Sequence, residues 1–123
     1  MTLHRVHLTL ARNDDHPNGS PAHGYDLVAP LDAEGMLDTE GWKAAPKACT
    51  VRRFWQGEED RVGLLRHIGR GWLIDYDAST READEPFFKL DKHIFKTGEY
   101  VSVTETDGEM LTFRIGNVEP VKA

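Results

Sequence analysis

The sequence predicts a mainly β fold: a small antiparallel β-barrel, or a strongly curved sheet, of about seven to eight short strands with one short helix. Short runs that alternate apolar and polar residues recur along the chain, which is typical of half-buried strands. Eleven glycines and six prolines divide the 123 residues into short pieces and favour strands over long helices. The length suits a single domain over residues 1–123, and a two-sheet sandwich is the alternative arrangement.

The N-terminal part of the chain contains two predicted strands separated by a polar loop. Residues 3–12 alternate apolar and polar side chains and form the first strand. Residues 13–24 are rich in turn formers and make a loop that is long for a compact domain, and long loops are more often functional or mobile. Residues 25–31 form the second strand, where Pro30 indicates an edge position or a strand end.

One short helix is predicted over residues 39–45, which is about two turns. Asp38 can cap its N-terminus, and Pro46 ends it. We expect Trp42 to pack against the sheet, so that the helix plugs one end of the barrel.

A meander of three strands is expected next, formed by residues 48–55, 61–68 and 72–76. In the third of these strands, Trp72 shares a face with Ile74. The residues that share one face of the second strand are Val62, Leu64 and Ile68.

The C-terminal hairpin is the best-specified part of the chain. Two β-rich runs, residues 100–105 and 110–115, flank an Asp-Gly turn signal at residues 107–108. A short strand or extended arm at residues 87–90 precedes the hairpin, and the tail beyond Val118 is expected to fray.

The register of the hairpin follows from the pairing of its apolar residues. A three-residue loop, residues 106–108, pairs Val103 with Leu111 and Val101 with Phe113. Because cross-strand partners share a face, this register gathers the apolar side chains on one side. The other face carries Tyr100, Ser102, Thr104, Thr112 and Arg114.

The composition argues against several classes of function. The net charge of −6 disfavours nonspecific binding to nucleic acid or to an anionic membrane. The single cysteine, Cys49, cannot form an internal disulfide. No stretch reaches the roughly 20 apolar residues that span a bilayer, so we expect a soluble cytoplasmic protein.

A histidine pair in the long loop is the first candidate site. With help from Asp14, Asp15 or Asp26, the imidazoles of His16 and His23 could bind zinc or another transition metal. No recognised ligand spacing supports this hypothesis, and solvated histidines are the more ordinary interpretation. The acidic residues 75–86 match only the first half of a calcium loop, since Thr80 stands where glycine is needed.

A basic segment with interleaved aromatic residues is the second candidate site. Arginines beside aromatic rings suit a phosphorylated or otherwise anionic ligand, although an ordinary sheet explains them too. Because adjacent strand residues face opposite ways, either Arg52 or Arg53 must enter the core side or lie at a rim. That arginine would need a carboxylate partner such as Asp75 or Asp26. The candidate ligand-binding residues are Arg52, Arg53, Arg66, Trp55 and Trp72.

Recognised catalytic motifs are missing from the sequence, and we expect no cofactor. Ser20 lies outside any Gly-x-Ser-x-Gly elbow, and Cys49 within a strand is best interpreted as a small core residue. The chain has neither a dinucleotide fingerprint nor a phosphate loop. The sequence therefore leans away from an enzyme.

Two segments resemble the two halves of a family of small uncharacterised bacterial proteins. The N-terminal segment is residues 23–31. The C-terminal segment combines His93-x-Phe95-x-x-Gly98-Glu99-Tyr100-Val101-Ser102-Val103 with Asp107-Gly108 and Thr112-Phe113-Arg114. The resemblance runs along most of the chain, but the family carries no assigned activity and so implies no site. Residues 95–101 are also similar to the start of a strand in the flavin-binding barrels of ferredoxin-reductase-type enzymes. The Arg-x-Tyr-Ser/Thr flavin motif of those barrels does not occur here.

These observations favour a non-enzymatic β-barrel module that binds a partner protein or a small anionic ligand. The expected binding surface joins the 16–23 loop to the basic segment that contains Arg52, Arg53, Arg66, Trp55 and Trp72. The alternative is a metal-dependent site, enzymatic or regulatory, on the 13–26 loop.

Overall fold

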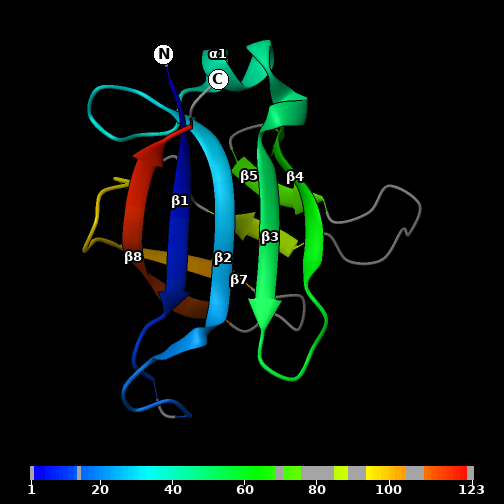
Figure 1. Ribbon diagram of the computed structural model, residues 1–123. Helices are drawn as coiled ribbons and strands as arrows, with labels where there is room; N and C mark the ends of the chain where they lie inside the picture. The colour runs from blue at the N-terminus through cyan, green and yellow to red at the C-terminus, as the bar shows by residue number, and fades with distance from the viewer. Residues whose placement is uncertain are drawn as a thin grey trace.

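The computed structural model describes residues 2–13, 15–68, 71–75, 85–88, 94–104 and 110–121. Within these residues, eight antiparallel strands follow one another in sequence order around a closed barrel (Figure 1). The barrel closes because β1 pairs with β2 on one side and with β8 on the other. The strands are β1 (Thr2–Leu10), β2 (Ser20–Leu31), β3 (Thr50–Trp55), β4 (Arg61–Ile68), β5 (Gly71–Asp75), β6 (Glu85–Phe88), β7 (Tyr100–Thr104) and β8 (Met110–Pro120). Helix α1 (Thr39–Ala44) and the 3₁₀ helix η1 (Pro46–Ala48) lie between β2 and β3, so the predicted fold class is confirmed.

Three long strands, β8, β1 and β2, form one continuous wall of the barrel (Figure 1). Across β1 and β2, Val6 pairs with Leu27 and Leu8 with Tyr25. All four side chains are fully buried, because the alternation of β1 and β2 turns them toward the barrel interior.

Side chains fill the interior of the barrel, as is usual for eight strands. Tyr25 and Phe113 meet edge to face, with 5.2 Å between their ring centroids. Trp72 and Ile74 point inward together, as predicted. The buried hydrophobic residues are Val6, Leu8, Leu10, Tyr25, Leu27, Ala29, Leu31, Cys49, Val51, Leu65, Trp72, Ile74, Phe95, Val101, Val103, Phe113 and Ile115.

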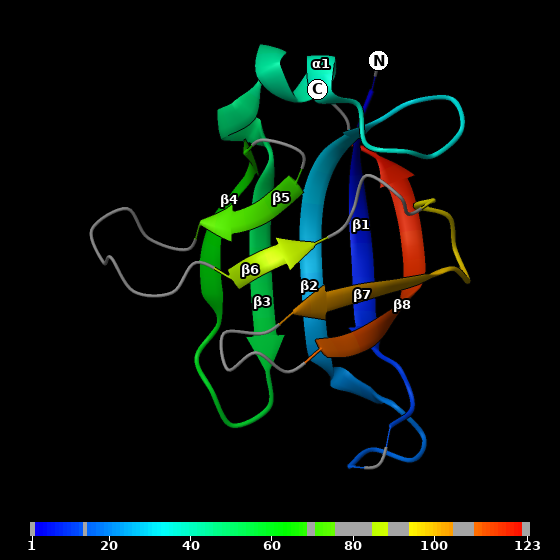
Figure 2. The same ribbon diagram turned by 180° about the vertical axis from the view of Figure 1, so that it is seen from behind.

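The helix α1 covers the end of the barrel at which both termini lie (Figure 2). Asp38 caps α1, and its side chain accepts a hydrogen bond from a backbone N–H of the first turn. Trp42 reaches down into the barrel end, where its Nε1 donates to the carbonyl of Leu65 at 2.8 Å. Its ring meets Trp72 at 5.9 Å between centroids, so the predicted end plug is confirmed.

The structure shows which face of strand β4 points into the barrel, a point that the sequence pattern left open. Val62 and Leu64 share a face, as predicted, but that face is the outer one, where they are 62% and 36% exposed. The pairing of Gly63 with the buried Val51 sets this register, so the side chain of Leu65 enters the core.

The C-terminal end of β8 also differs from the expectation of a frayed tail. Beyond Val118, Glu119 pairs with Arg5 and Pro120 pairs with His4. Cross-strand pairing with β1 therefore orders this segment as far as Pro120.

The strand β2 begins at Ser20, inside the loop predicted over residues 13–24. Pro30 lies next to the end of β2, which is one of the two positions predicted for it. It lies past the β2–β3 register, which ends at the pair of Leu27 and Val51, so its missing N–H removes no bond to β3.

The register predicted for the C-terminal hairpin is confirmed, since Val103 pairs with Leu111 and Val101 with Phe113. The turn itself, at residues 105–109, lies outside the described residues. The same holds for His93 and for most of the acidic stretch that was compared with a calcium loop.

Candidate functional site

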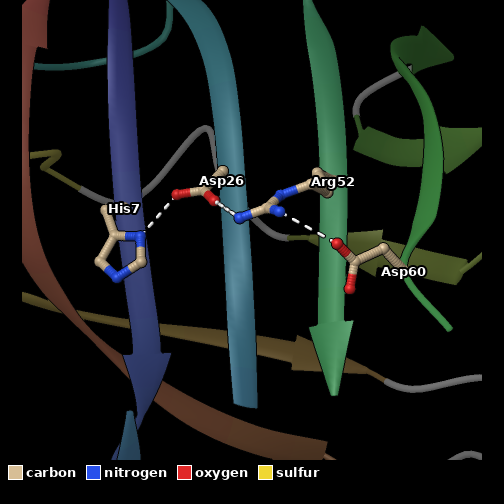
Figure 3. A network of polar contacts seen from close by, with 4 residues as sticks. All are labelled: His7, Asp26, Arg52 and Asp60. Carbon is tan, nitrogen blue, oxygen red and sulfur yellow. Dashed lines mark hydrogen bonds and ion pairs between the residues drawn. The ribbon is translucent and has the colours of Figure 1, made fainter. Parts of the chain in front are cut away.

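Arg52 lies on the outer wall of the barrel, where two carboxylates bind it (Figure 3). Its guanidinium group donates to Oδ2 of Asp26 at 2.6 Å and to Oδ2 of Asp60 at 3.0 Å. The other carboxylate oxygen of Asp26 lies 2.5 Å from Nδ1 of His7. The four side chains therefore form a chain of polar contacts across β1, β2 and β3.

The electrostatics of this chain favour ion pairing within the fold. Partial burial alone would raise the pKa of Asp26, but hydrogen bonds from His7 and Arg52 outweigh burial and lower that pKa. The bond to Asp26 raises the pKa of Arg52. The ring of Phe54 stacks on His7 and lies 5.3 Å from the guanidinium of Arg52. The charge of Arg52 is thus balanced by the protein's own groups.

Arg53 takes the inner side of β3, as the alternation of the strand requires. Its side chain is 11% exposed, and its guanidinium lies 4.1 Å from the ring centroid of Trp55. It donates to Oε1 of Glu58 at 3.3 Å. The inward arginine therefore has a carboxylate partner, as predicted, but this partner is Glu58 rather than Asp75 or Asp26.

Arg66 and Trp72 lie apart from Arg53 and Trp55. Arg66 is on the outer wall and donates to Oδ2 of Asp75 at 3.0 Å. Trp72 is 1% exposed in the core beneath α1. The five residues predicted for one anion site are therefore dispersed over the outer wall, the core and one barrel end. The cause is the pleat of the strands, which sends neighbouring residues to opposite faces.

His16 lies in the loop between β1 and β2, at the barrel end opposite α1 (Figure 1), and its ring centroid is 4.8 Å from that of His23. Asp26 does not join them, because it faces outward to His7 while His23 faces inward. Among the residues that the structure describes, no three His, Cys, Asp or Glu side chains gather into a metal-binding group. The Nδ1 atom of His16 is buried and has no hydrogen-bond partner in the described part of the chain.

His23 is held tightly at this barrel end and is 5% exposed. Its Nδ1 lies 2.6 Å from Oγ of Ser20, and its ring meets Trp55 edge-on at 4.5 Å between centroids. Burial lowers the pKa of His23, and electrostatic interactions with His16 and Arg53 lower it further against an opposing interaction with Glu58. The imidazole of His23 is therefore neutral at neutral pH.

A groove of about 510 Å³ lies where the loop between β1 and β2 folds back beside β8. Its floor is the outer face of the wall, where Thr9 on β1 pairs with Arg114 on β8. Arg114 pairs in turn with Tyr100 on β7. The polar residues that line the groove include Thr9, Arg12, Ser20, Tyr100, Thr112 and Arg114.

Among the residues that the structure describes, two arginines and no carboxylate line this groove, so the described lining carries positive charge. Neither Arg12 nor Arg114 forms an ion pair with any residue that the structure describes. In this they differ from Arg52, Arg53 and Arg66, each of which donates to a carboxylate.

Backbone contacts hold the loop against the strands. The N–H of Gly19 donates to the carbonyl of His16 at 2.9 Å, and Gly19 has a φ of 73°, which favours glycine. A Cβ at Gly19 would come within 2.7 Å of the carbonyl oxygen of Leu10. On the other side, the N–H of Ala11 donates to the carbonyl of Thr112 at 2.9 Å. The walls of the groove are thus set by backbone geometry.

A second groove of about 350 Å³ lies on the outer face of β1 to β4. Asp26 lines it together with Arg52, Val28 and Val62. The carboxylate and the apolar side chains make this groove less suited to an anion than the groove beside β8.

The sequence contains a partial signal for the groove beside β8. The predicted hairpin already places Tyr100, Thr112 and Arg114 on one outer face. Arg12 and Ser20 line the groove only because β1 pairs with β8 and because the loop between β1 and β2 folds back beside β8. No local sequence pattern predicts either of these two features.

Comparison of the chain with protein-family models, with curated proteins and with solved structures finds no match. The resemblance to small bacterial proteins therefore stays a prediction. Among the described residues, no helix is both long and apolar enough to cross a membrane.

Proposed function

We propose that the protein is a β-barrel module that binds a small anionic ligand in the groove beside β8. The observation that carries the proposal is that Arg12 and Arg114 line one groove in which no described residue supplies a carboxylate, in a chain of net charge −6. A guanidinium group that pairs with no described carboxylate is suited to bind a carboxylate or a phosphate ligand with two parallel hydrogen bonds.

The size and lining of the groove favour a compact ligand. A volume of about 510 Å³ lies within the range of about 300–1,000 Å³ that small-molecule sites occupy. Tyr100, which is 54% exposed beside Arg114, offers a ring face, and Thr9 and Thr112 offer hydroxyl groups. A carboxylic acid or phosphate ester that also carries hydroxyl groups matches this lining.

The negative net charge favours a small anion over a nucleic acid. A polyanion would meet repulsion from the rest of the surface, whereas a small ligand interacts mainly with the local charge of the groove.

Calorimetric titration at low salt tests the proposal with inorganic phosphate, citrate and a sugar phosphate as probes. We expect at least one probe to bind, and Arg114→Gln to weaken its binding about ten-fold or more, since a charge-assisted hydrogen bond contributes about 1.5–3 kcal/mol. Arg66→Gln is the matched control, because Arg66 is a surface arginine outside the groove. The proposal fails if no probe binds, or if Arg66→Gln weakens binding as much as Arg114→Gln.

A metal-dependent role at His16 and His23 is the second candidate, favoured by the buried Nδ1 of His16 that no described residue binds. Elemental analysis of untagged protein and melting in the presence of zinc test this role. Stoichiometric metal, and a zinc-dependent rise in Tm that His16→Ala removes, would support it. Trace metal and an unchanged Tm would eliminate it.

A further inference from the structure

We propose that Ser20 and His23 form a nucleophile–base pair that hydrolyses small acyl esters whose anionic group is held by Arg12 and Arg114. The inference rests on the anion site proposed above. Ser20 lines the groove, and its Oγ lies 2.6 Å from Nδ1 of His23. This is the distance at which an imidazole nitrogen takes a proton from a hydroxyl group.

The hydrogen bonds around Ser20 orient its hydroxyl group toward the base. The backbone N–H of Ala22 donates to Oγ of Ser20 at 3.2 Å. This bond uses a lone pair of Oγ and not its hydrogen, so the hydroxyl group can donate to Nδ1 of His23 in the tautomer that carries the ring proton on Nε2. A neutral imidazole accepts that hydrogen, and the other lone pair of Oγ can attack a bound ester.

Among the described residues, aromatic neighbours and no carboxylate position the ring of His23. It meets Trp55 at 4.5 Å and His16 at 4.8 Å between centroids, and only 5% of His23 is exposed. Packing of this kind holds a base in one orientation, which is a requirement for efficient proton transfer. The nucleophile and the base are three residues apart on β2, where the pairing with β1 shifts from Gly24 opposite Thr9 to Ser20 opposite Leu10. This irregularity interrupts the alternation of the strand, which would otherwise turn the two side chains to opposite faces.

The reaction balances with water as the only co-reactant. Oγ of Ser20 attacks the carbonyl carbon, its proton moves to Nδ1 of His23, and the departing alkoxide takes that proton as the ester C–O bond breaks. Water then attacks the acyl group on Ser20 and gives a proton to His23. The bond between Oγ and the acyl carbon breaks, and Oγ recovers the proton, which releases the acid.

Two chromogenic esters test this pair, the neutral 4-nitrophenyl acetate and the anionic mono-4-nitrophenyl succinate. We expect Ser20→Ala to lower kcat/KM for both esters about 100-fold or more, the scale of a lost proton-transfer pair. Ser102→Ala is the matched control and should keep the wild-type rates, since Ser102 is a half-buried strand serine outside the groove. Arg114→Gln should raise KM for the succinate ester about ten-fold more than it raises KM for the acetate ester.

A covalent probe gives a second readout. Phenylmethylsulfonyl fluoride should modify Ser20, located by peptide mass spectrometry, and His23→Gln should abolish the modification. If circular dichroism shows that His23→Gln is unfolded, the ester-hydrolysis rates of Ser20→Ala alone test the inference. Hydrolysis that survives Ser20→Ala, or a sulfonyl adduct on any serine but Ser20, overturns the inference.

The two esters separate this inference from the anion site on which it rests. Ser20-dependent hydrolysis of both esters without preference for the succinate ester supports the nucleophile–base pair and removes the anion site. Arg114-dependent binding of phosphate or citrate without any Ser20-dependent hydrolysis overturns the pair and leaves the binding function in place.

Discussion

The guanidinium of Arg52 on β3 donates a 2.6 Å hydrogen bond to Asp26 on β2, and this bond decides the role of both residues. The bond holds the guanidinium of Arg52 against the outer wall of the barrel. It also occupies Asp26, which faces outward and does not contact His16 or His23. Because Asp26 also contacts His7 on β1, three neighbouring strands are joined by one carboxylate (Figure 3).

Replacement of Asp26 by asparagine should destabilise the protein by about 1 kcal/mol. The change removes the negative charge that accepts hydrogen bonds from His7 and Arg52. Because these groups are partly exposed, the loss of stability should lie at or below the low end of the range for hydrogen bonds to charged groups. Urea unfolding monitored by tryptophan fluorescence measures the loss. Asp60→Asn is the control and should cost less, since Asp60 is more exposed and contacts Arg52 alone within this chain of contacts. Equal losses for the two variants would contradict this account.

The contribution of Asp26 should also depend on pH in a defined direction. Its folded-state pKa is lowered, so its stabilisation is fully present above the ordinary unfolded value of about 4 and is lost as pH falls through the folded pKa. We expect the gap in unfolding free energy between wild type and Asp26→Asn to be larger at pH 5 than at pH 3. A gap that stays constant or grows on acidification would show that the pKa of Asp26 is not lowered.

Gly24 on β2 should not tolerate a side chain. A Cβ at this position would lie 2.0 Å from the carbonyl oxygen of Leu8 and 2.9 Å from Cζ of Phe54. We expect Gly24→Ala to cost about 3 kcal/mol or to prevent folding, which thermal melting would reveal. Gly116→Ala is the control and should change stability by less than about 0.5 kcal/mol, because its Cβ meets nothing closer than 3.8 Å. A well-folded Gly24→Ala variant would mean that β1 and β2 are not packed in this register.

Cys49 should be unreactive in the folded protein. It is fully buried, and burial raises the pKa of its thiol from 9.0 to about 11, which lowers the thiolate fraction about 100-fold. Reaction with a disulfide reagent at pH 8 should therefore be at least about 100-fold slower in buffer than in guanidinium chloride. Comparable rates in the two solvents would place Cys49 outside the core.

Local sequence patterns predicted those elements of the fold whose pairing or ends are determined by residues close together in the chain. Alternation in the hairpin is sufficient to set the pairing of Val101 with Phe113, and the cap at Asp38 with the large Trp42 is sufficient to predict a helix that closes the barrel. Local patterns could not predict which face of β4 points into the barrel. Val62 and Leu64 are as apolar as Leu65, and only the pairing of β4 with β3 determines which of them faces inward.

The candidate sites were harder to predict because they combine residues that are distant in sequence. The alternation rule correctly required Arg52 and Arg53 to separate, but it could not say that Asp26 would bind the outer one and Glu58 the inner one. Arg12 and Arg114 are about a hundred residues apart, and their shared groove exists only because β8 closes the barrel against β1.

Chemical-shift mapping of the backbone amides during titration with citrate tests the central claim most directly. If the groove beside β8 binds the anion, the largest shifts should occur at Gly19, Thr112 and Arg114 and should disappear in Arg114→Gln. Shifts centred instead on Arg52 and Arg66, or no saturable shift at all, would contradict an anion site in this groove.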